Sequence, residues 1–336
     1  MPNKPAITSS ELGILWITYQ EKTMVIQMLE YFIAKSDDDK SNKIMVDLYK
    51  KLNNYVEKVK EIFEDEGAVI PLGYTSKDVN TEAPKLYNNG FDILFVRLLK
   101  KISMGLHTLN LNMAYREDII ILLKDLTATC QAAYNDCTKY LIEKGLIARP
   151  PYTTMPNSID FITDKNYLGG LNPLTKIRKK RTLNTVEVAY MYHMIETNNV
   201  GLQMVTGFAQ SAKQQDIRNF FSNGAELSKS IIKEISETFL EDSIQVPSSS
   251  GGHATRSTIP PFSDKLMMYC TSIFCDFAMG GNSLGTAFSR RYDLAAKMMT
   301  FAKDIYEYAN EGAKLMIKNG WMEEPPQMEE RGNLKP

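Results

Sequence analysis

Apolar residues recur every three or four positions along four segments of the first half of the chain, and this spacing predicts amphipathic helices. The first segment, 9–34, carries its apolar stripe at Leu12, Leu15, Tyr19, Ile26, Leu29 and Ile33. Ser9 and Ser10 come before the stripe and are plausible capping residues. Similar stripes predict helices near 41–66, from Gly90 to about Asn112, and over 116–145.

The second half repeats the same four segments. Its first stripe, which Asn184 or Thr185 can cap, runs through Val188, Met191, Ile195, Leu202, Val205 and Ala209. Helices are then predicted over 214–242, from Ser263 to about Phe288, and over 290–319. In both halves the fourth helix is followed by a glycine and, within six residues, by a Pro-Pro pair, which is a strong stop signal.

Identical residues recur between the halves at an offset of 175 or 176 positions, which indicates an internal duplication. The matched pairs include Gln27-Met28 with Gln203-Met204, Phe63 with Phe239, and Met104-Gly105 with Met279-Gly280. They keep their order along the chain. We therefore expect a first four-helix bundle in 1–165, a linker with a basic run in 166–183, and a second four-helix bundle in 184–336.

A long connection separates the second and third predicted helices of each half, over about 67–88 and 243–262. A helix of about 26 residues is about 39 Å long, and about 20 extended residues reach at most about 65 Å. The connection can therefore run the whole length of a bundle, as it does in ferritin-like folds. The predicted fold class is all-α: two tandem ferritin-like four-helix bundles, packed through a pseudo-twofold or head-to-tail interface.

The composition indicates a globular protein with an ordinary core, because hydrophobic residues make up 43% of the chain and charged residues 24%. The 39 basic and 40 acidic residues nearly cancel, so no overall field attracts nucleic acid or an anionic membrane. The first apolar run is too short for a signal peptide, and no stretch of about 20 apolar residues is present. We expect a soluble, cytoplasmic protein whose partners include neither nucleic acid nor membrane.

The cysteines have spacings that fit neither a zinc site nor a redox pair. They lie in predicted helices at Cys130, Cys137, Cys270 and Cys275. We interpret them as reduced residues that serve as small core side chains.

A ferritin-like di-iron centre requires a Glu-x-x-His motif from each of two helices. The chain has three histidines, and the residues three positions before them are Met104, Tyr190 and Ser250. No Glu-x-x-His motif exists, which excludes a di-iron or di-manganese centre of the usual type. Gly281-Asn-Ser-Leu-Gly285 has the Gly-x-Ser-x-Gly spacing, but it lies inside a predicted helix and follows no strand, so it does not form a nucleophile elbow. We expect no metal, no cofactor and no enzymatic activity.

One polar layer interrupts the apolar stripe of the first helix in both copies. Lys22 takes a position where an apolar residue belongs, and Asn198 takes the same position in the second copy. Glu21 is adjacent to Lys22, and His193 and Glu196 lie within about one turn of Asn198. These residues are candidates for binding a ligand or a lone metal. The structural alternative, which we favour, is that Asn198 fixes the register while Lys22 snorkels outward.

The fourth helix begins with the same pair of charges in both copies, Arg116 and Asp118 in the first and Arg291 and Asp293 in the second. A carboxylate in the first turn suits the positive end of the helix dipole, and arginine can pair with a neighbouring carboxylate. We interpret the pairs as a repeated structural clasp; an anion site is the alternative. The basic run 176–181 is interpreted as a solvated linker.

Three stretches of the chain resemble a known family: Arg181-Thr-Leu-Asn-Thr-Val-Glu187, Ile259-Pro-Pro-Phe-Ser-Asp-Lys-Leu-Met-Met268 and Asn319-Gly-Trp-Met-Glu-Glu-Pro-Pro326. The chain is similar to the tandem ferritin-like proteins of endospore-forming bacteria, a family of unknown function. Their architecture is similar to that of coat F-like spore proteins. The first half departs from the pattern, because Gly145-Leu-Ile-Ala-Arg-Pro-Pro151 replaces the Gly-Trp form.

The resemblance implies a non-enzymatic structural or packing protein that is associated with the spore or with sporulation. Its expected partners are a second copy of the chain or proteins of the spore layers. A second hypothesis is a protein that holds a small hydrophobic or anionic ligand in a bundle core. A third is an atypical metal enzyme that uses Glu21, His193 and Glu196.

Overall fold

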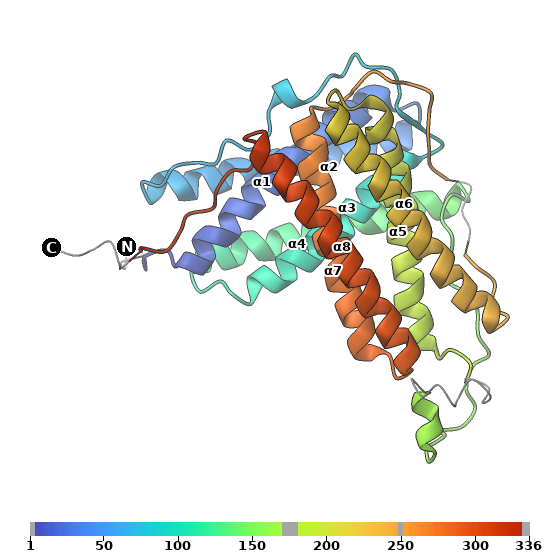
Figure 1. The fold of residues 1–336 in the computed structure, drawn as a ribbon. Helices are drawn as coiled ribbons and strands as arrows, with labels where there is room; N and C mark the ends of the chain where they lie inside the picture. Colours follow the sequence, from blue (N-terminus) through green and yellow to red (C-terminus); the bar gives the residue numbers. More distant parts are fainter. Residues whose placement is uncertain (1–3, 170–180, 248–250, 331–336) are drawn as a thin grey trace.

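The computed structural model describes residues 4–169, 181–247 and 251–330, and it is built from eight α-helices in two repeated halves (Figure 1). The first half contains α1 (Ser9–Lys35), α2 (Asp39–Asp65), α3 (Phe91–Leu111) and α4 (Glu117–Glu143). The second half contains α5 (Thr185–Ser211), α6 (Gln215–Glu241), α7 (Asp264–Phe288) and α8 (Tyr292–Lys318). The all-helical, duplicated organisation predicted from the sequence is confirmed.

Both halves begin with the same helix cap. The Thr8 hydroxyl accepts a hydrogen bond from the Glu11 backbone N–H, and the Glu11 carboxylate accepts one from the Thr8 N–H at 2.9 Å. Asn184 and Glu187 form the same capping box at the start of α5. The reciprocal bonds satisfy backbone donors that have no partner within the helix. The cap of α1 is thus Thr8, one residue before the predicted Ser9.

The two long connections, 66–90 and 242–263, lie side by side over 78–89 and 252–263 and join the halves. Strand β1 (Tyr87–Asn88) pairs antiparallel with β2 (His253–Ala254), and Val79 bridges to Phe262. The same register continues through backbone bonds that join Asp78 to Ser263, Asn80 to Pro261, Leu86 to Thr255 and Asn89 to Gly252. Equivalent segments of the repeats therefore meet about a local pseudo-twofold axis.

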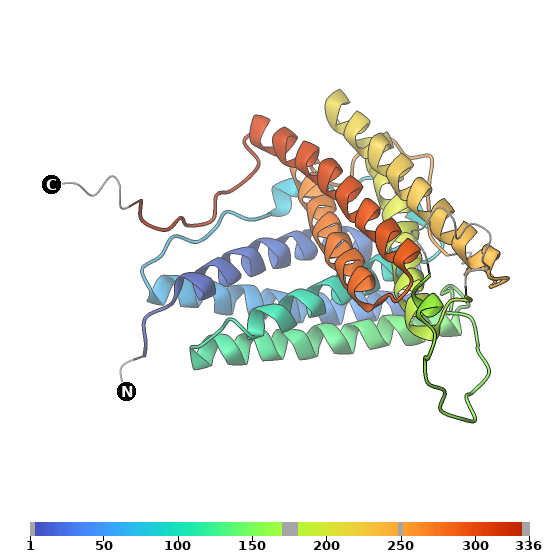
Figure 2. The ribbon, with the colours of Figure 1, turned by 60° about the horizontal axis from the view of Figure 1, so that its bottom comes forward.

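The helices of the two halves cross each other, and their buried side chains merge into one core. Figure 2 shows α7 and α8 lying steeply across the helices of the first half. Phe95 of α3 stacks on Phe274 of α7 with ring centroids 5.5 Å apart. Tyr31 of α1 meets Phe262 edge-on at 5.2 Å. A single cluster of buried apolar residues spans both halves, and a second cluster fills the distal end of the second half. The halves are thus parts of one folded unit.

The remaining predictions about the fold have mixed outcomes. All four cysteines are free and buried, as expected of core residues. No helix in the described part of the chain is long and apolar enough to cross a membrane. The basic run 176–181 lies outside the described residues except for Arg181, so its interpretation as a solvated linker stays a prediction, as do the boundaries 1–165, 166–183 and 184–336.

Candidate functional site

A layer of charged side chains lies inside the first half, between α1 and α3. Lys22 donates a hydrogen bond to the Glu21 carboxylate, and the Ser103 hydroxyl donates to its other oxygen at 2.6 Å. Nε2 of His107 lies 3.9 Å from Oε2 of Glu21, and Lys100 belongs to the same layer. Their exposed fractions are only 0–2%. We call these five residues the charged layer.

Lys22 does not extend to solvent, which corrects the expectation that it would snorkel outward. Its side chain is 1% exposed, because the Glu21 carboxylate beside it holds the ammonium group inside. Burial would raise the pKa of Glu21, but the Lys22 ammonium group, through its charge and its hydrogen bond, is the main cause that lowers that pKa to about 2. Burial lowers the pKa of His107 to about 3, so its imidazole is neutral at physiological pH. The layer holds a charged pair beside a neutral histidine.

Two members of the charged layer have polar atoms without a hydrogen-bond partner among the described residues. They are the Lys100 amine and both ring nitrogens of His107. Burial lowers the pKa of Lys100 and favours its uncharged form. A buried polar group without a partner costs free energy. In the charged layer, both oxygens of Glu21 therefore have hydrogen-bond donors. Lys100 and His107, which lack a partner among the described residues, lower the stability of the fold.

The equivalent layer of the second half is neutral and hollow. Thr197 and Asn198 of α5 replace Glu21 and Lys22 at an offset of 176, and Cys275 of α7 replaces Lys100 at an offset of 175. A cavity of about 60 Å³ lies here among all four helices of the half. The Asn198 amide donates to the Met194 carbonyl at 2.9 Å, so it bonds its own helix. We call this space the second-half cavity.

Tyr308 of α8 contributes the principal unsatisfied polar group of the second-half cavity. Its hydroxyl is buried and has no hydrogen-bond partner among the described residues. Its ring stacks on Phe220 at 4.3 Å, and a Cβ atom at Gly224 would come within 2.2 Å of the hydroxyl. Gly224 therefore lets the hydroxyl approach the α6 backbone. Burial raises the pKa of Tyr308 well above its usual value, so the phenol stays protonated.

Glu196 and His193 lie apart from the second-half cavity, on the side of α5 that faces the first half. Glu196 accepts hydrogen bonds from Arg97 at 2.5 Å and Lys101 at 2.8 Å, both on α3. His193 packs edge-on against Phe277 at 5.4 Å, and burial lowers its pKa to about 4. The structure thus divides the predicted polar constellation between the charged layer, the second-half cavity and a contact between the halves.

A larger pocket of about 330 Å³ also lies where the halves meet, and Glu196 forms part of its wall. Both oxygens of this carboxylate are engaged by Arg97 and Lys101. In the described part of the chain, no group of three or more His, Cys, Asp or Glu side chains is arranged to hold a metal ion. Glu21 and Glu196 serve separate ion pairs, so the arrangement offers no support for the atypical metal enzyme.

The repeated arginine and aspartate pairs form matching networks at the start of α4 and α8. In the first half, Arg116 is 2% exposed and its Nε donates to Asp118 at 2.8 Å. The same guanidinium donates to Glu66 at the end of α2. Glu11 of α1 accepts hydrogen bonds from the backbone N–H groups of Tyr115 and Arg116 at 2.8 and 2.7 Å. The network ties the ends of three helices together.

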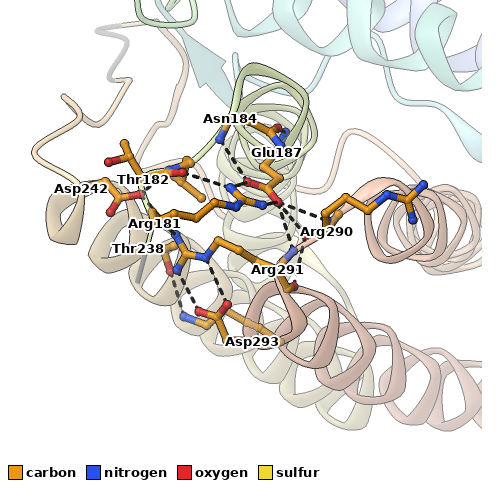
Figure 3. A network of polar contacts seen from close by, with 12 residues as sticks. Arg181, Thr182, Asn184, Glu187, Thr238, Asp242, Arg290, Arg291 and Asp293 are labelled. Atoms are coloured by element: carbon orange, nitrogen blue, oxygen red, sulfur yellow. Dashed lines mark hydrogen bonds and ion pairs between the residues drawn. The ribbon is translucent and has the colours of Figure 1, made fainter. Parts of the chain in front are cut away.

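The second network repeats this arrangement with its own partners (Figure 3). Arg291 is 2% exposed, and it donates to Asp293 at 3.1 and 2.9 Å and to Asp242 at 3.3 Å. Glu187 replaces Glu11 and accepts from the Arg291 backbone N–H at 3.2 Å. Arg181 adds a bidentate pair to Glu187 at 2.7 and 2.8 Å. The side chains of Arg181 and Arg291 pair with Glu187, Asp242 and Asp293, an arrangement that fits the predicted clasp.

Together, the fold and its polar layers define an all-helical tandem-repeat protein. Inside it, buried and partly buried carboxylates form ion pairs with lysine and arginine side chains of the same chain. The chain belongs to the DUF3231 family of proteins of unknown function, whose family model matches it twice, over residues 1–159 and 172–334.

Comparison with other proteins adds one structural likeness. The chain is similar to the crystal structure of a "putative spore coat protein" from Bacillus halodurans C-125, with 19% identity and a TM-score of 0.42. The likeness covers 45% of this chain and 98% of that one. No curated protein matches the sequence. The function is therefore inferred from the geometry of the chain itself.

Proposed function

We propose that the protein is a non-enzymatic structural or packing protein. One observation carries this proposal: in the two carboxylates nearest to a catalytic constellation, both oxygens accept hydrogen bonds from side chains of the same chain. Glu21 is 2% exposed and bonds Lys22 and Ser103, and Glu196 bonds Arg97 and Lys101. An acid, base or nucleophile must reach a substrate within hydrogen-bond distance. These carboxylates reach only their own chain.

The finer assignment of each half as a ferritin-like four-helix bundle belongs to the same proposal. Helices α1, α2, α4, α5, α6 and α8 each have 27 residues. The connections 66–90 and 242–263 are long enough to run along such helices. A single long crossover in a four-helix bundle is typical of ferritin-like folds.

The partner surface in this proposal is the segment 149–164, which follows α4 and protrudes from the molecule (Figure 2). It has little regular structure and displays large apolar side chains that are 63–86% exposed: Tyr152, Met155, Ile159, Phe161 and Ile162. Clustered exposed apolar residues are typical of interaction sites. We propose that this segment attaches the protein to a second copy of the chain or to proteins of a spore layer. The protein would be made in the cytoplasm of a sporulating cell.

Fractionated spores of an endospore-forming host test the proposed role. We expect antibody detection to find the protein in a spore fraction, and a Tyr152→Ser/Ile159→Ser/Phe161→Ser variant to be lost from it. A Met299→Ser/Tyr306→Ser variant on exposed positions of α8 is the control and should stay in that fraction. Uniform distribution of the unmodified protein through the vegetative cytoplasm would contradict the proposal.

A second candidate function is the binding of a small molecule in the second half. It is favoured by the second-half cavity, in which the buried Tyr308 hydroxyl lacks a partner among the described residues. Buried polar groups in proteins are normally satisfied by a neighbour, an ordered water or a ligand. This candidate is compatible with a structural role, because no residue of the segment 149–164 lines the second-half cavity.

A further inference from the structure

Because the chain is duplicated, each residue around the second-half cavity can be compared with its equivalent in the first half. There, long side chains such as Lys22 and Lys100 occupy the same layer. Shorter residues surround the cavity at several equivalent positions of α5 and α7. They include Asn198 for Lys22, Gly201 for Val25 and Cys275 for Lys100. On α6, Gly224 and Ser228 replace Leu48 and Leu52. These exchanges remove more side-chain volume from the layer than Tyr308 for Ala133 and Ile305 for Cys130 add on α8, which leaves a space there.

The chemistry of the cavity walls excludes ions. The lining contains no Asp, Glu, Lys, Arg or His, in contrast to the charged layer of the first half. Its two titratable groups are Cys275 and Tyr308. Burial raises the pKa of the Cys275 thiol to about 12 and the pKa of the Tyr308 phenol well above its usual value, so both are neutral. Desolvating a charged molecule here would meet no opposite charge.

Hydrogen bonding selects a molecule that carries an acceptor. The hydroxyls of Thr197 and Thr271 and the amide of Asn198 donate to carbonyl groups of their own helices, at 2.9–3.0 Å. Tyr308 carries a buried donor that is not satisfied by any described residue. A carbonyl or hydroxyl oxygen in the cavity would satisfy it. The other walls are mainly apolar and suit a hydrocarbon remainder, as at Met204, Val205, Ile231 and Phe274.

We propose that the second-half cavity binds a small uncharged molecule whose carbonyl or hydroxyl oxygen accepts a hydrogen bond from Tyr308. The volume of about 60 Å³ indicates how much of a molecule fits within the walls. A buried water needs about 10–15 Å³ by this measure, so the space holds on the order of four to six atoms other than hydrogen. The proposal rests on the second candidate function and adds the ligand class and its contact.

The test uses the full chain labelled with ¹³C-methyl methionine and three probes: acetone, acetate and xenon. Acetate has the shape of acetone but carries a charge, and xenon is apolar. Met204 lines the cavity, and its equivalent Met28 lies in the filled core of the first half. We expect acetone and xenon to shift the Met204 methyl resonance in a saturable way, with Met28 unchanged and acetate without effect.

Variants identify the contact. Tyr308→Phe should weaken acetone binding about tenfold and leave xenon binding unchanged, because it removes one hydrogen bond and keeps the space. Gly201 lines the cavity, and a Cβ atom there meets nothing within 4 Å, so Gly201→Leu should abolish binding of both probes. Gly201→Ala serves if the larger residue prevents folding. Gly280→Leu is the matched control, because Gly280 is an exposed helical glycine with the same open surroundings outside the cavity.

The outcomes separate the ligand class from the existence of a binding site. If neither acetone nor xenon shifts Met204, both this proposal and the second candidate function are wrong. If xenon binds but acetone does not, or if Tyr308→Phe leaves acetone affinity unchanged, the ligand class is wrong and the second candidate remains. Binding of acetate as strong as that of acetone would overturn the assignment of an uncharged ligand.

Discussion

Replacing Lys22 with methionine should lower the free energy of unfolding by about 3–5 kcal/mol. The substitution removes the ammonium group that bonds the Glu21 carboxylate and leaves that charge buried at 2% exposure. The carboxyl would respond by taking up a proton, since its pKa would rise without Lys22. The loss measured by urea unfolding should therefore be smaller at about pH 5 than at about pH 8.

Lys100→Met is the matched variant in the same layer, and it should have the opposite sign. The Lys100 amine is fully buried and has no hydrogen-bond partner among the described residues. Methionine fills similar space without a polar group, so the protein should gain about 1–3 kcal/mol of stability. If Lys100→Met were as destabilising as Lys22→Met, the amine would have a partner such as a bound anion, and the sealed charged layer would be refuted.

Arg291→Ala should also lower the free energy of unfolding, by about 3–5 kcal/mol, because it breaks the second clasp from its centre. The buried guanidinium bonds Asp293 and Asp242 and the Arg181 carbonyl, and truncation leaves these acceptors unmatched. The equivalent Arg116→Ala should also lower the free energy of unfolding in the first half, where Glu66 loses the Arg116 guanidinium and Asp118 keeps only Lys4 as an ion-pair partner. Urea unfolding of the intact chain measures both changes in stability.

The neighbouring Arg290 provides the control for the clasp. Its side chain is exposed, and only its backbone N–H bonds Glu187. Arg290→Ala should change stability by less than about 0.5 kcal/mol. Arg291→Lys should recover part of the loss, since it keeps the charge but not the bidentate geometry. An Arg291→Ala variant as stable as Arg290→Ala would show that the clasp does not hold the helix ends.

Most of the helical organisation was predictable, because each helix carries its own apolar stripe. The first helix was predicted over 9–34 and spans Ser9–Lys35, and the constant offset identified the second copy. The contact between the halves was not predictable. Aromatic residues such as Phe95 and Phe274 form it, and in the sequence they look like ordinary core residues of their own helices. Periodicity reports that a face is buried, not which surface buries it.

The candidate site was predictable only in part. The layer shared by Lys22 and Asn198 was visible because both interrupt the apolar stripe of the first helix. Lys100, Ser103 and His107 were missed as its partners, although a lysine and a histidine inside the apolar third helix were a signal. The contact of Glu11 with the start of α4 was also missed. Glu11 accepts from the backbone N–H groups of Tyr115 and Arg116, and the sequence does not reveal bonds to backbone groups.

The central claim is that both interiors are occupied by side chains or neutral molecules and that neither holds a reactive metal centre. Metal content by elemental analysis, read together with the native mass of the intact chain, tests it most directly. The protein should be produced with iron, manganese and zinc supplied and purified without chelators. We predict no stoichiometric metal in either half. One or more equivalents of metal per chain, lost on Glu21→Gln or Glu196→Gln substitution, would contradict the account.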